Sequence, residues 1–393
     1  MEKITFIEFL DAFKSKQEVL NYEYLKFIQN VNADFYSNNY SNPQMVGYCP
    51  SIQETNKYNQ WMQKNQVQLK IEDDRPEKFI DANINTISDL IKLIDNNQYD
   101  DDYKYNIDLQ SLHKIKHELE SLNNMVGLET IKTSILDQLL YFLQGLHNIG
   151  NGDYKHTILY GPPGTGKTEI AKILGQMYSK IGILKNNFFK KVTRSDLIAG
   201  YLGQTAIKTK KVIEECKGGV LFIDEVYSLG SQVDDDNYSK ECIDTLCEAL
   251  SSNKEDLMVI VAGYEKEIQE RFLSRNSGLE SRFLWKFEMD KYTASDMFTI
   301  FIRMVVANKW KYAETITEEW FEKNKEYLPA FGRDIEKLFS HSKVAYGRRS
   351  YGKKDIEKQV ISLEDLNKGF DIFKSNKMKN NELPKYIHQT LYC

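Results

Sequence analysis

Five short apolar runs, separated by longer amphipathic stretches, occupy the middle of the chain. Runs of this length that are rich in β-branched and aromatic residues are typical of strands. They are HTILY before a glycine-rich loop, FFKKVT (Phe188 to Thr193), GVLFIDE (Gly219 to Glu225), LMVIVAGY (Leu257 to Tyr264) and FLWKFEM (Phe283 to Met289). Strands that alternate with helices build a parallel sheet, so from about residue 125 the pattern predicts an α/β domain.

After Lys291 the strand pattern stops and a helical pattern begins. The segment YTASDMFTIFIRMV places Met297, Ile300, Phe301 and Met304 on one helical face, and the chain to about residue 375 is predicted to be all-helical. We therefore expect a mostly helical N-terminal region over residues 1–110, the α/β domain over 111–290, and a helical domain with a C-terminal tail over 291–393.

The N-terminal region has no glycine motif, and turn-like clusters separate its amphipathic pieces. One piece follows a Thr5/Glu8 capping box, and its apolar face consists of Phe6, Phe9, Leu10 and Phe13. A second piece has the face Ile87, Leu90, Ile91 and Ile94. These helices either contact a partner or pack on the neighbouring domain, and the second alternative is favoured.

Composition and charge restrict the kinds of partner and the cellular compartment expected for this protein. The 393 residues include 52 basic and 57 acidic side chains, so the net charge of −5 gives no overall attraction to nucleic acid or to an anionic membrane. Five cysteines form no CxxC pair, which indicates reduced thiols. They are Cys49, Cys216, Cys242, Cys247 and Cys393. No secretion signal or long apolar segment is apparent, so we expect a soluble, intracellular protein, in the cytoplasm.

The glycine-rich loop satisfies the pattern G-x-x-x-x-G-K-T between the first strand and a helix. Pro162 and Pro163 have no backbone N–H, so the donors that face the phosphates begin at Gly164. They continue through Thr165, Gly166, Lys167 and Thr168, followed by Glu169. Pro163 is still expected to flank the bound nucleotide. The Lys167 ammonium is expected to reach the β- and γ-phosphates of ATP, and the Thr168 hydroxyl is expected to bind Mg²⁺.

Asp224 and Glu225 end the third apolar run. The first carboxylate is then expected within reach of Mg²⁺ and the second beside the γ-phosphate, where it can polarise an attacking water. This arrangement favours a hydrolase over a kinase, because no motif for a phosphate acceptor is apparent.

These motifs resemble those of AAA+ ATPases, and within them the CfxQ-like group that includes the red-type Rubisco activase CbbX and SpoVK-related proteins. The resemblance covers about two-thirds of the chain, from Leu119 to Gly369, and is carried by LNNMVGLETIK, SDLIAGYLGQTAIKT, GVLFIDEVYSLG, VIVAGY and NSGLESRF. It implies a five-stranded parallel sheet flanked by helices, a C-terminal helical lid, and an oligomeric ring, expected to be a hexamer, that hydrolyses ATP.

The resemblance also assigns roles to residues outside the phosphate loop. Val126 and Gly127 match the pair that contacts adenine, although an ordinary turn explains them equally well. Tyr264 stands where many AAA+ proteins have the asparagine called sensor 1, which leaves the orientation of the attacking water open. Arg333 matches the lid arginine called sensor 2, which reports the γ-phosphate.

An arginine finger that reaches the neighbouring subunit's ATP is implied at Arg282 by its SRF context. Arg271 and Arg275 are nearby competitors.

Tyr201 lies in the motif GYLG, which the resemblance places on a loop that lines the pore of the ring and grips a polypeptide. A tyrosine that caps the sheet edge is the alternative.

The sequence thus favours an ATP-driven motor that remodels or threads a protein client, whose identity it does not reveal. A nucleic-acid loader and a nucleotide-gated scaffold are the other classes. Net acidity disfavours the loader, and the retained ATPase motif residues disfavour the scaffold.

Overall fold

The computed structural model describes residues 75–149, 152–201, 203–230, 236–354 and 357–382. The helix expected around Phe6 to Phe13, as well as Cys49, Leu202 and Cys393, lies outside the described residues. Cys216, Cys242 and Cys247 are buried free thiols. None of the helices in the described part of the chain combines the length and the apolar character needed to cross a membrane.

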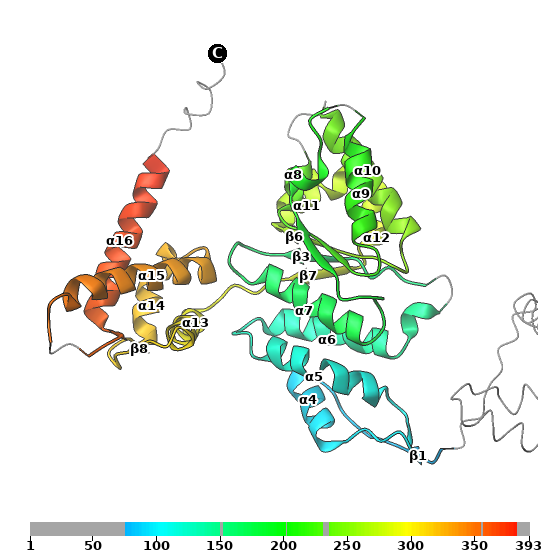
Figure 1. The fold of residues 1–393 in the computed structure, drawn as a ribbon, viewed down its shortest axis with the longest axis horizontal. Helices are drawn as coiled ribbons and strands as arrows, with labels where there is room; N and C mark the ends of the chain where they lie inside the picture. The colour runs from blue at the N-terminus through cyan, green and yellow to red at the C-terminus, as the bar shows by residue number, and fades with distance from the viewer. Residues whose placement is uncertain (1–74, 150–151, 202, 231–235, 355–356, 383–393) are drawn as a thin grey trace, which may run out of the picture. The chain divides into compact units, whose positions relative to one another are not determined.

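A five-stranded parallel sheet forms the centre of the α/β domain (Figure 1). Its strands are β3 (Thr157–Tyr160), β4 (Phe189–Val192), β5 (Val220–Ile223), β6 (Met258–Gly263) and β7 (Trp285–Glu288), in the order β4-β5-β6-β3-β7. Each strand falls within one of the five predicted runs, so the predicted fold class is confirmed. Because all strands are parallel, their carboxyl ends meet at one edge of the sheet.

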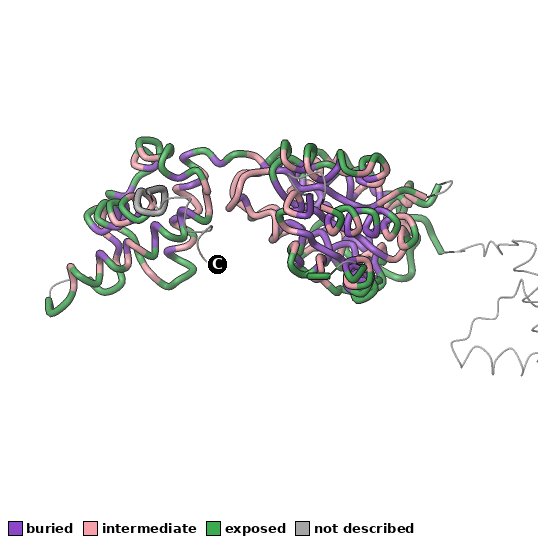
Figure 2. The backbone as a smooth tube through the Cα atoms, turned by 90° about the horizontal axis from the view of Figure 1, so that it is seen from above, coloured by how far each residue is buried: buried purple, intermediate pink, exposed green. Residues whose placement is uncertain are grey.

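Helices cover both faces of this sheet, and alternate strand residues enter two different hydrophobic cores. Leu159 packs on the side of the first group of helices, whereas Ile158 packs on the side of the second. The first group comprises α4 (Ile87–Asn96), α5 (Leu109–Asn123), α6 (Glu129–Leu143) and α7 (Lys167–Lys180). The second comprises α9 (Thr205–Glu215), α10 (Asn237–Ser252), α11 (Glu265–Arg271) and α12 (Ser277–Arg282). Figure 2 shows the buried residues gathered in the interior and the exposed residues around them.

Helix α4 begins at a capping box, in which the Thr86 side chain accepts from the Asp89 N–H and the Asp89 carboxylate accepts from the Thr86 N–H. Its buried face contains Leu93, while Ile91, expected on this face, is only half-buried. Helix α5 starts at Leu109, before the domain boundary expected at residue 110, and packs with α4 in one core. Partner binding by the N-terminal region stays a prediction.

The C-terminal helices are α13 (Ala294–Ala307), α14 (Glu318–Asn324), α15 (Phe331–Ser350) and α16 (Leu363–Glu382). On α13, Met297 and Phe301 are buried, whereas Ile300 and Met304 are half-buried. The expectation that strands end at Lys291 is wrong in one detail, because β8 (Lys311–Tyr312) and β9 (Val360–Ile361) pair in parallel. Two-residue strands are too short to leave a period in the sequence.

Short helical turns complete the connections. They are η1 (Leu146–Asn148), α8 (Arg194–Leu197), η2 (Val226–Leu229), η3 (Leu273–Arg275) and η4 (Lys325–Tyr327). The remaining two-residue strands, β1 (Glu77–Lys78) and β2 (Lys104–Tyr105), pair with each other.

Candidate nucleotide-binding site

The glycine-rich loop lies between β3 and the first turn of α7, at the carboxyl edge of the sheet. Gly164 has φ +78° and Gly166 has φ +93°, a backbone conformation that residues with a β-carbon rarely adopt. Thr165 has a buried side chain, and its hydroxyl donates to the Pro162 carbonyl oxygen over 2.9 Å. The Thr165 side chain therefore fixes the loop from inside, while the neighbouring residues face the cavity.

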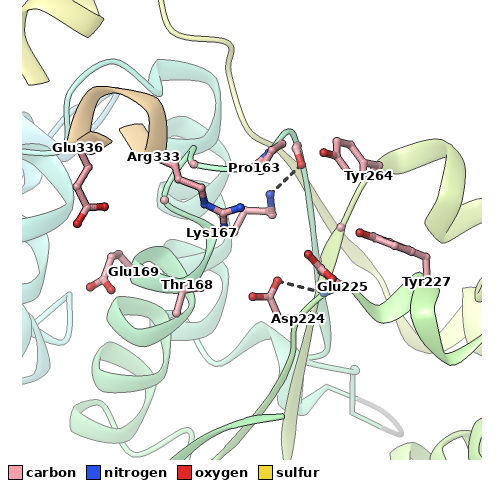
Figure 3. Close-up of a pocket in the computed structure, with 14 residues that line it drawn as sticks. Pro163, Lys167, Thr168, Glu169, Asp224, Glu225, Tyr227, Tyr264, Arg333 and Glu336 are labelled. Atoms are coloured by element: carbon pink, nitrogen blue, oxygen red, sulfur yellow. Dashed lines mark hydrogen bonds between the residues drawn. The ribbon is translucent and has the colours of Figure 1, made fainter. Parts of the chain in front are cut away.

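A cavity of about 310 Å³ opens beside this loop (Figure 3). Its walls come from the loop, from the ends of β5 and β6, and from the start of α15. The lining residues are Gly161, Pro163, Gly164, Gly166, Lys167, Thr168, Glu169, Asp224, Glu225, Tyr227, Gly263, Tyr264, Arg333 and Glu336. The structure thus brings together most of the predicted nucleotide and metal contacts, which lie far apart in the sequence.

Lys167 extends into the cavity and donates to the carbonyl oxygens of Gly161, over 2.8 Å, and Pro162, over 2.7 Å. Burial lowers the pKa of this ammonium, and the nearby Asp224 carboxylate opposes that effect. A half-buried cation beside a row of backbone N–H groups is well suited to bind phosphate oxygens.

Asp224 and Glu225 follow β5 on the opposite side of the cavity, as Figure 3 shows. One carboxylate oxygen of Asp224 accepts from the Glu225 N–H over 3.1 Å, and the other lies 2.6 Å from the Lys191 ammonium nitrogen. Glu225 has a left-handed backbone (φ 50°, ψ 46°), a conformation that is costly for a residue with a side chain and is found mainly at functional positions. Its strained backbone directs the carboxylate into the cavity.

The residues around the cavity fit a nucleotide-bound Mg²⁺. Within the described residues no group of three or more His, Cys, Asp or Glu side chains could hold a metal ion alone. Magnesium is usually held by one or two protein oxygens together with phosphates and water. Thr168 and Asp224, both at the cavity wall, supply a hydroxyl and a carboxylate of that kind.

The lid side of the cavity depends on two glycines. The Gly332 N–H, in the first turn of α15, donates to the Gly164 carbonyl oxygen over 3.1 Å. A β-carbon on Gly164 would lie 2.0 Å from the Ala330 carbonyl oxygen, so only glycine permits this approach. The contact holds Arg333, the next residue of α15, at the cavity wall.

Thr165, described above, does not line the cavity, and neither do Val126, Gly127 and Arg282. Val126 and Gly127 precede α6, and a β-carbon on Gly127 would lie 3.1 Å from an Asp296 carboxylate oxygen at the start of α13. Arg282 ends α12, where its Nε donates to the Ser251 hydroxyl over 2.7 Å and its Nη1 donates to the Gly278 carbonyl oxygen. The proposed contacts of these residues with adenine and with a neighbouring subunit stay predictions.

Tyr201 lies in the loop between α8 and α9, and its side chain is 73% exposed. A β-carbon on either neighbouring glycine, Gly200 or Gly203, would meet nothing within 4 Å. In α8, the helix that precedes this loop, Arg194 donates to the carbonyl oxygens of Ser228, over 2.7 Å, and Leu229, over 3.1 Å. Arg194 thus connects α8 to η2, the turn that follows Glu225.

The sequence did not reveal two side chains of the cavity. Tyr227 comes two residues after Glu225, and the apolar pattern around it gave no sign that its ring faces the nucleotide. Glu336 lies one helical turn after Arg333, and this i, i+3 spacing is the signal that could have identified it.

Comparisons with known proteins agree with this geometry. A family model described as "ATPase family associated with various cellular activities (AAA)" matches residues 157–286. A cfxQ-like protein of Acanthamoeba polyphaga mimivirus is 38% identical over 275 residues, which cover 69% of this chain and 68% of that protein. Stage V sporulation protein K of Bacillus subtilis is 32% identical over 65% of this chain and 78% of its own length. The CfxQ homolog of Pyropia yezoensis is 31% identical over 64% of this chain and 89% of its own length. The chain therefore belongs to the CfxQ-like group of AAA ATPases, and its reaction is the hydrolysis of ATP.

Proposed function

We propose that this ATPase remodels a protein client by threading it through the pore of an oligomeric ring, which we expect to be a hexamer. The observation that carries the proposal is Tyr201, a large aromatic side chain that is 73% exposed on a loop flanked by two unobstructed glycines. An aromatic ring with a polar tip can grip a polypeptide without requiring a particular sequence, and the resemblance places this ring on the pore loop.

Hydrogen bonds connect the turn after Glu225 to α8, the helix that precedes the Tyr201 loop. Arg194, in the helix before the Tyr201 loop, bonds to two carbonyl oxygens of η2, which begins immediately after Glu225. It also donates to the Asp236 carboxylate at the start of α10, over 2.9 Å. Because a guanidinium holds several acceptors in a fixed fork, a shift of Glu225 during hydrolysis would be transmitted to the base of the Tyr201 loop.

In the proposed reaction, Lys167 binds the β- and γ-phosphates, Thr168 and Asp224 hold Mg²⁺, and Glu225 accepts a proton from the attacking water. Arg333 contacts the γ-phosphate from the lid. Arg282 completes the site of a neighbouring subunit, and in support of this role it does not line the cavity of its own subunit. Assembly into a ring is therefore required for full activity.

A trapping experiment tests the threading of a client. Glu225→Gln with ATP and Mg²⁺ should retain bound client, because nucleotide binds but is not hydrolysed, and the retained protein is identified by mass spectrometry. Adding Tyr201→Ala to this variant should abolish the capture, whereas Tyr201→Phe should preserve most of it, because the ring supplies the grip.

Tyr351→Ala is the matched control, since Tyr351 is 90% exposed but lies after α15, in the lid. All variants are compared at the same oligomeric state and nucleotide occupancy. If the Tyr201→Ala form captures the same protein in the same amount as its parent, the aromatic loop does not grip a client. Binding to nucleic acid that weakens steeply with salt would favour a loader instead.

A further inference from the structure

Tyr227 occupies a fixed position beside Glu225. It is the second residue of η2, and the Ser228 N–H donates to the Glu225 carbonyl oxygen over 2.8 Å, which closes the turn that carries both side chains. The Tyr227 ring packs on Gly263, where a β-carbon would lie only 2.8 Å from Cδ1 of the ring. Glycine at the end of β6 is therefore what lets this ring approach the cavity.

The Tyr227 hydroxyl faces the nucleotide cavity. Figure 3 shows it pointing into the cavity on the side where Glu225 lies. None of the hydrogen bonds among the described residues uses this hydroxyl, so it is available to a ligand or a water in the cavity. Burial, followed by the Glu225 carboxylate, raises the pKa of Tyr227, so the phenol keeps its proton at neutral pH.

A second tyrosine, Tyr264, stands where an asparagine is common in related ATPases. Its ring centroid is 6.0 Å from that of Tyr227, and both rings line the cavity. Tyr264 is 39% exposed and follows β6, whereas Tyr227 is more enclosed and shares a turn with Glu225. Of the two hydroxyls, only that of Tyr227 is carried by the same short turn as the catalytic carboxylate.

We propose that Tyr227 donates a hydrogen bond to the γ-phosphoryl group as it is transferred and, together with Glu225, positions the attacking water. A phenol both donates and accepts, so it can hold an anionic oxygen or orient a water molecule, as an amide does. The inference rests on ATP hydrolysis and is independent of whether the protein threads a client.

The step balances without any further reactant. The water oxygen forms a bond to the γ-phosphorus while Glu225 takes one proton from the water. The bond from the γ-phosphorus to the bridging oxygen breaks, and ADP leaves with the electron pair. Tyr227 keeps its proton throughout and stabilises the charge on the transferring phosphoryl group.

Tyr227→Phe tests the proposal, because phenylalanine keeps the packing on Gly263 and removes only the hydroxyl. We expect kcat to fall about 10- to 100-fold with little change in KM, the loss expected when one hydrogen bond to a charged group is removed from the transition state. A binding readout accompanies the kinetics. Affinity for ADP should be unchanged, whereas affinity for ADP with aluminium fluoride, which mimics the transferring phosphoryl group, should fall by a similar factor.

One competing variant and one control separate this role from general effects. Tyr264→Phe removes the other tyrosine hydroxyl of the cavity, and its loss of kcat should be smaller than that of Tyr227→Phe. Tyr312→Phe removes a hydroxyl from a residue on β8 that is 37% exposed, and it should change nothing. The proposal is overturned if Tyr227→Phe retains kcat within twofold, if it weakens ADP and the fluoride complex equally, or if Tyr264→Phe shows the larger loss.

Discussion

Replacing Gly332 with alanine should loosen the contact between the phosphate-binding loop and the lid, and thereby weaken ATP binding. The new β-carbon would lie 2.9 Å from the Gly164 carbonyl oxygen, so the two backbones must separate by a few tenths of an ångström. The 3.1 Å hydrogen bond between these residues would lengthen, and Arg333 would move with its helix. Losing one such bond costs about 1 kcal/mol, which corresponds to roughly fivefold weaker binding.

Gly164→Ala perturbs the same contact more severely. Its β-carbon would lie 2.0 Å from the Ala330 carbonyl oxygen and 2.9 Å from the Arg333 nitrogen, and the backbone φ of +78° disfavours alanine. The lid must then retreat far enough to remove Arg333 from the γ-phosphate. Loss of a charged hydrogen bond of about 1.5–3 kcal/mol predicts roughly 10- to 150-fold weaker ATP binding.

Gly347→Ala is the matched control, since it lies within the same helix and its β-carbon would meet nothing within 4 Å. It should leave affinity unchanged and stabilise the helix by about 0.5–1 kcal/mol. Fluorescence titration with ADP and with a non-hydrolysable ATP analogue measures the series, and circular dichroism confirms folding. The reasoning fails if Gly332→Ala binds the analogue as tightly as the parent, or if Gly164→Ala is the milder change.

Three further outcomes follow from the site and the core. Lys167→Ala should abolish nucleotide binding while Glu225→Gln retains it and loses hydrolysis, because Lys167 contacts phosphate in the ground state whereas Glu225 acts only as water attacks; equal loss of affinity would contradict these roles. Mixing inactive Arg282→Ala with inactive Glu225→Gln should restore some ATPase activity at mixed interfaces, and no recovery in mixed rings would contradict a shared site. Burial lowers the pKa of His156 to about 4, below the value of about 6.5 in an unfolded chain, so the unfolded state binds more protons between these values. The free energy of unfolding should therefore fall by about 2 kcal/mol from pH 7 to pH 5, measured by urea titration, and the His156→Gln form should lack this part of the slope.

Local patterns predicted the parts of the fold that local chemistry determines. The run from Val220 to Ile223 is apolar on both faces, so a buried parallel strand was its simplest interpretation, and the structure confirms it. The phosphate-binding role of the glycine-rich loop could be predicted in the same way, because its glycines, its lysine and the helix that follows are all found in one short segment. In α4, by contrast, Leu93 took a buried position and Ile91 did not, since the neighbouring α5 decides which side of the face is covered.

Contacts between distant segments were beyond the reach of the sequence. The approach of Gly332 to Gly164 depends on how the lid meets the loop, and neither residue signals it alone. The same holds for Tyr227, whose ring faces the cavity only because Gly263, on another strand, leaves space for it. Arg333 was identified through the family resemblance, and its location in the cavity is consistent with the predicted role without testing it.

The fork of Arg194 has a consequence for how this protein can vary. Its guanidinium bonds to the Ser228 and Leu229 carbonyl oxygens in η2 on one side and to Asp236 and Ser239 at the start of α10 on the other. One side chain of α8 therefore ties together a turn and a helix that come after it in the chain. A shorter or uncharged residue at this position would leave several acceptors without their donor at once, so position 194 should tolerate substitution less well than the 37% exposure of its side chain suggests.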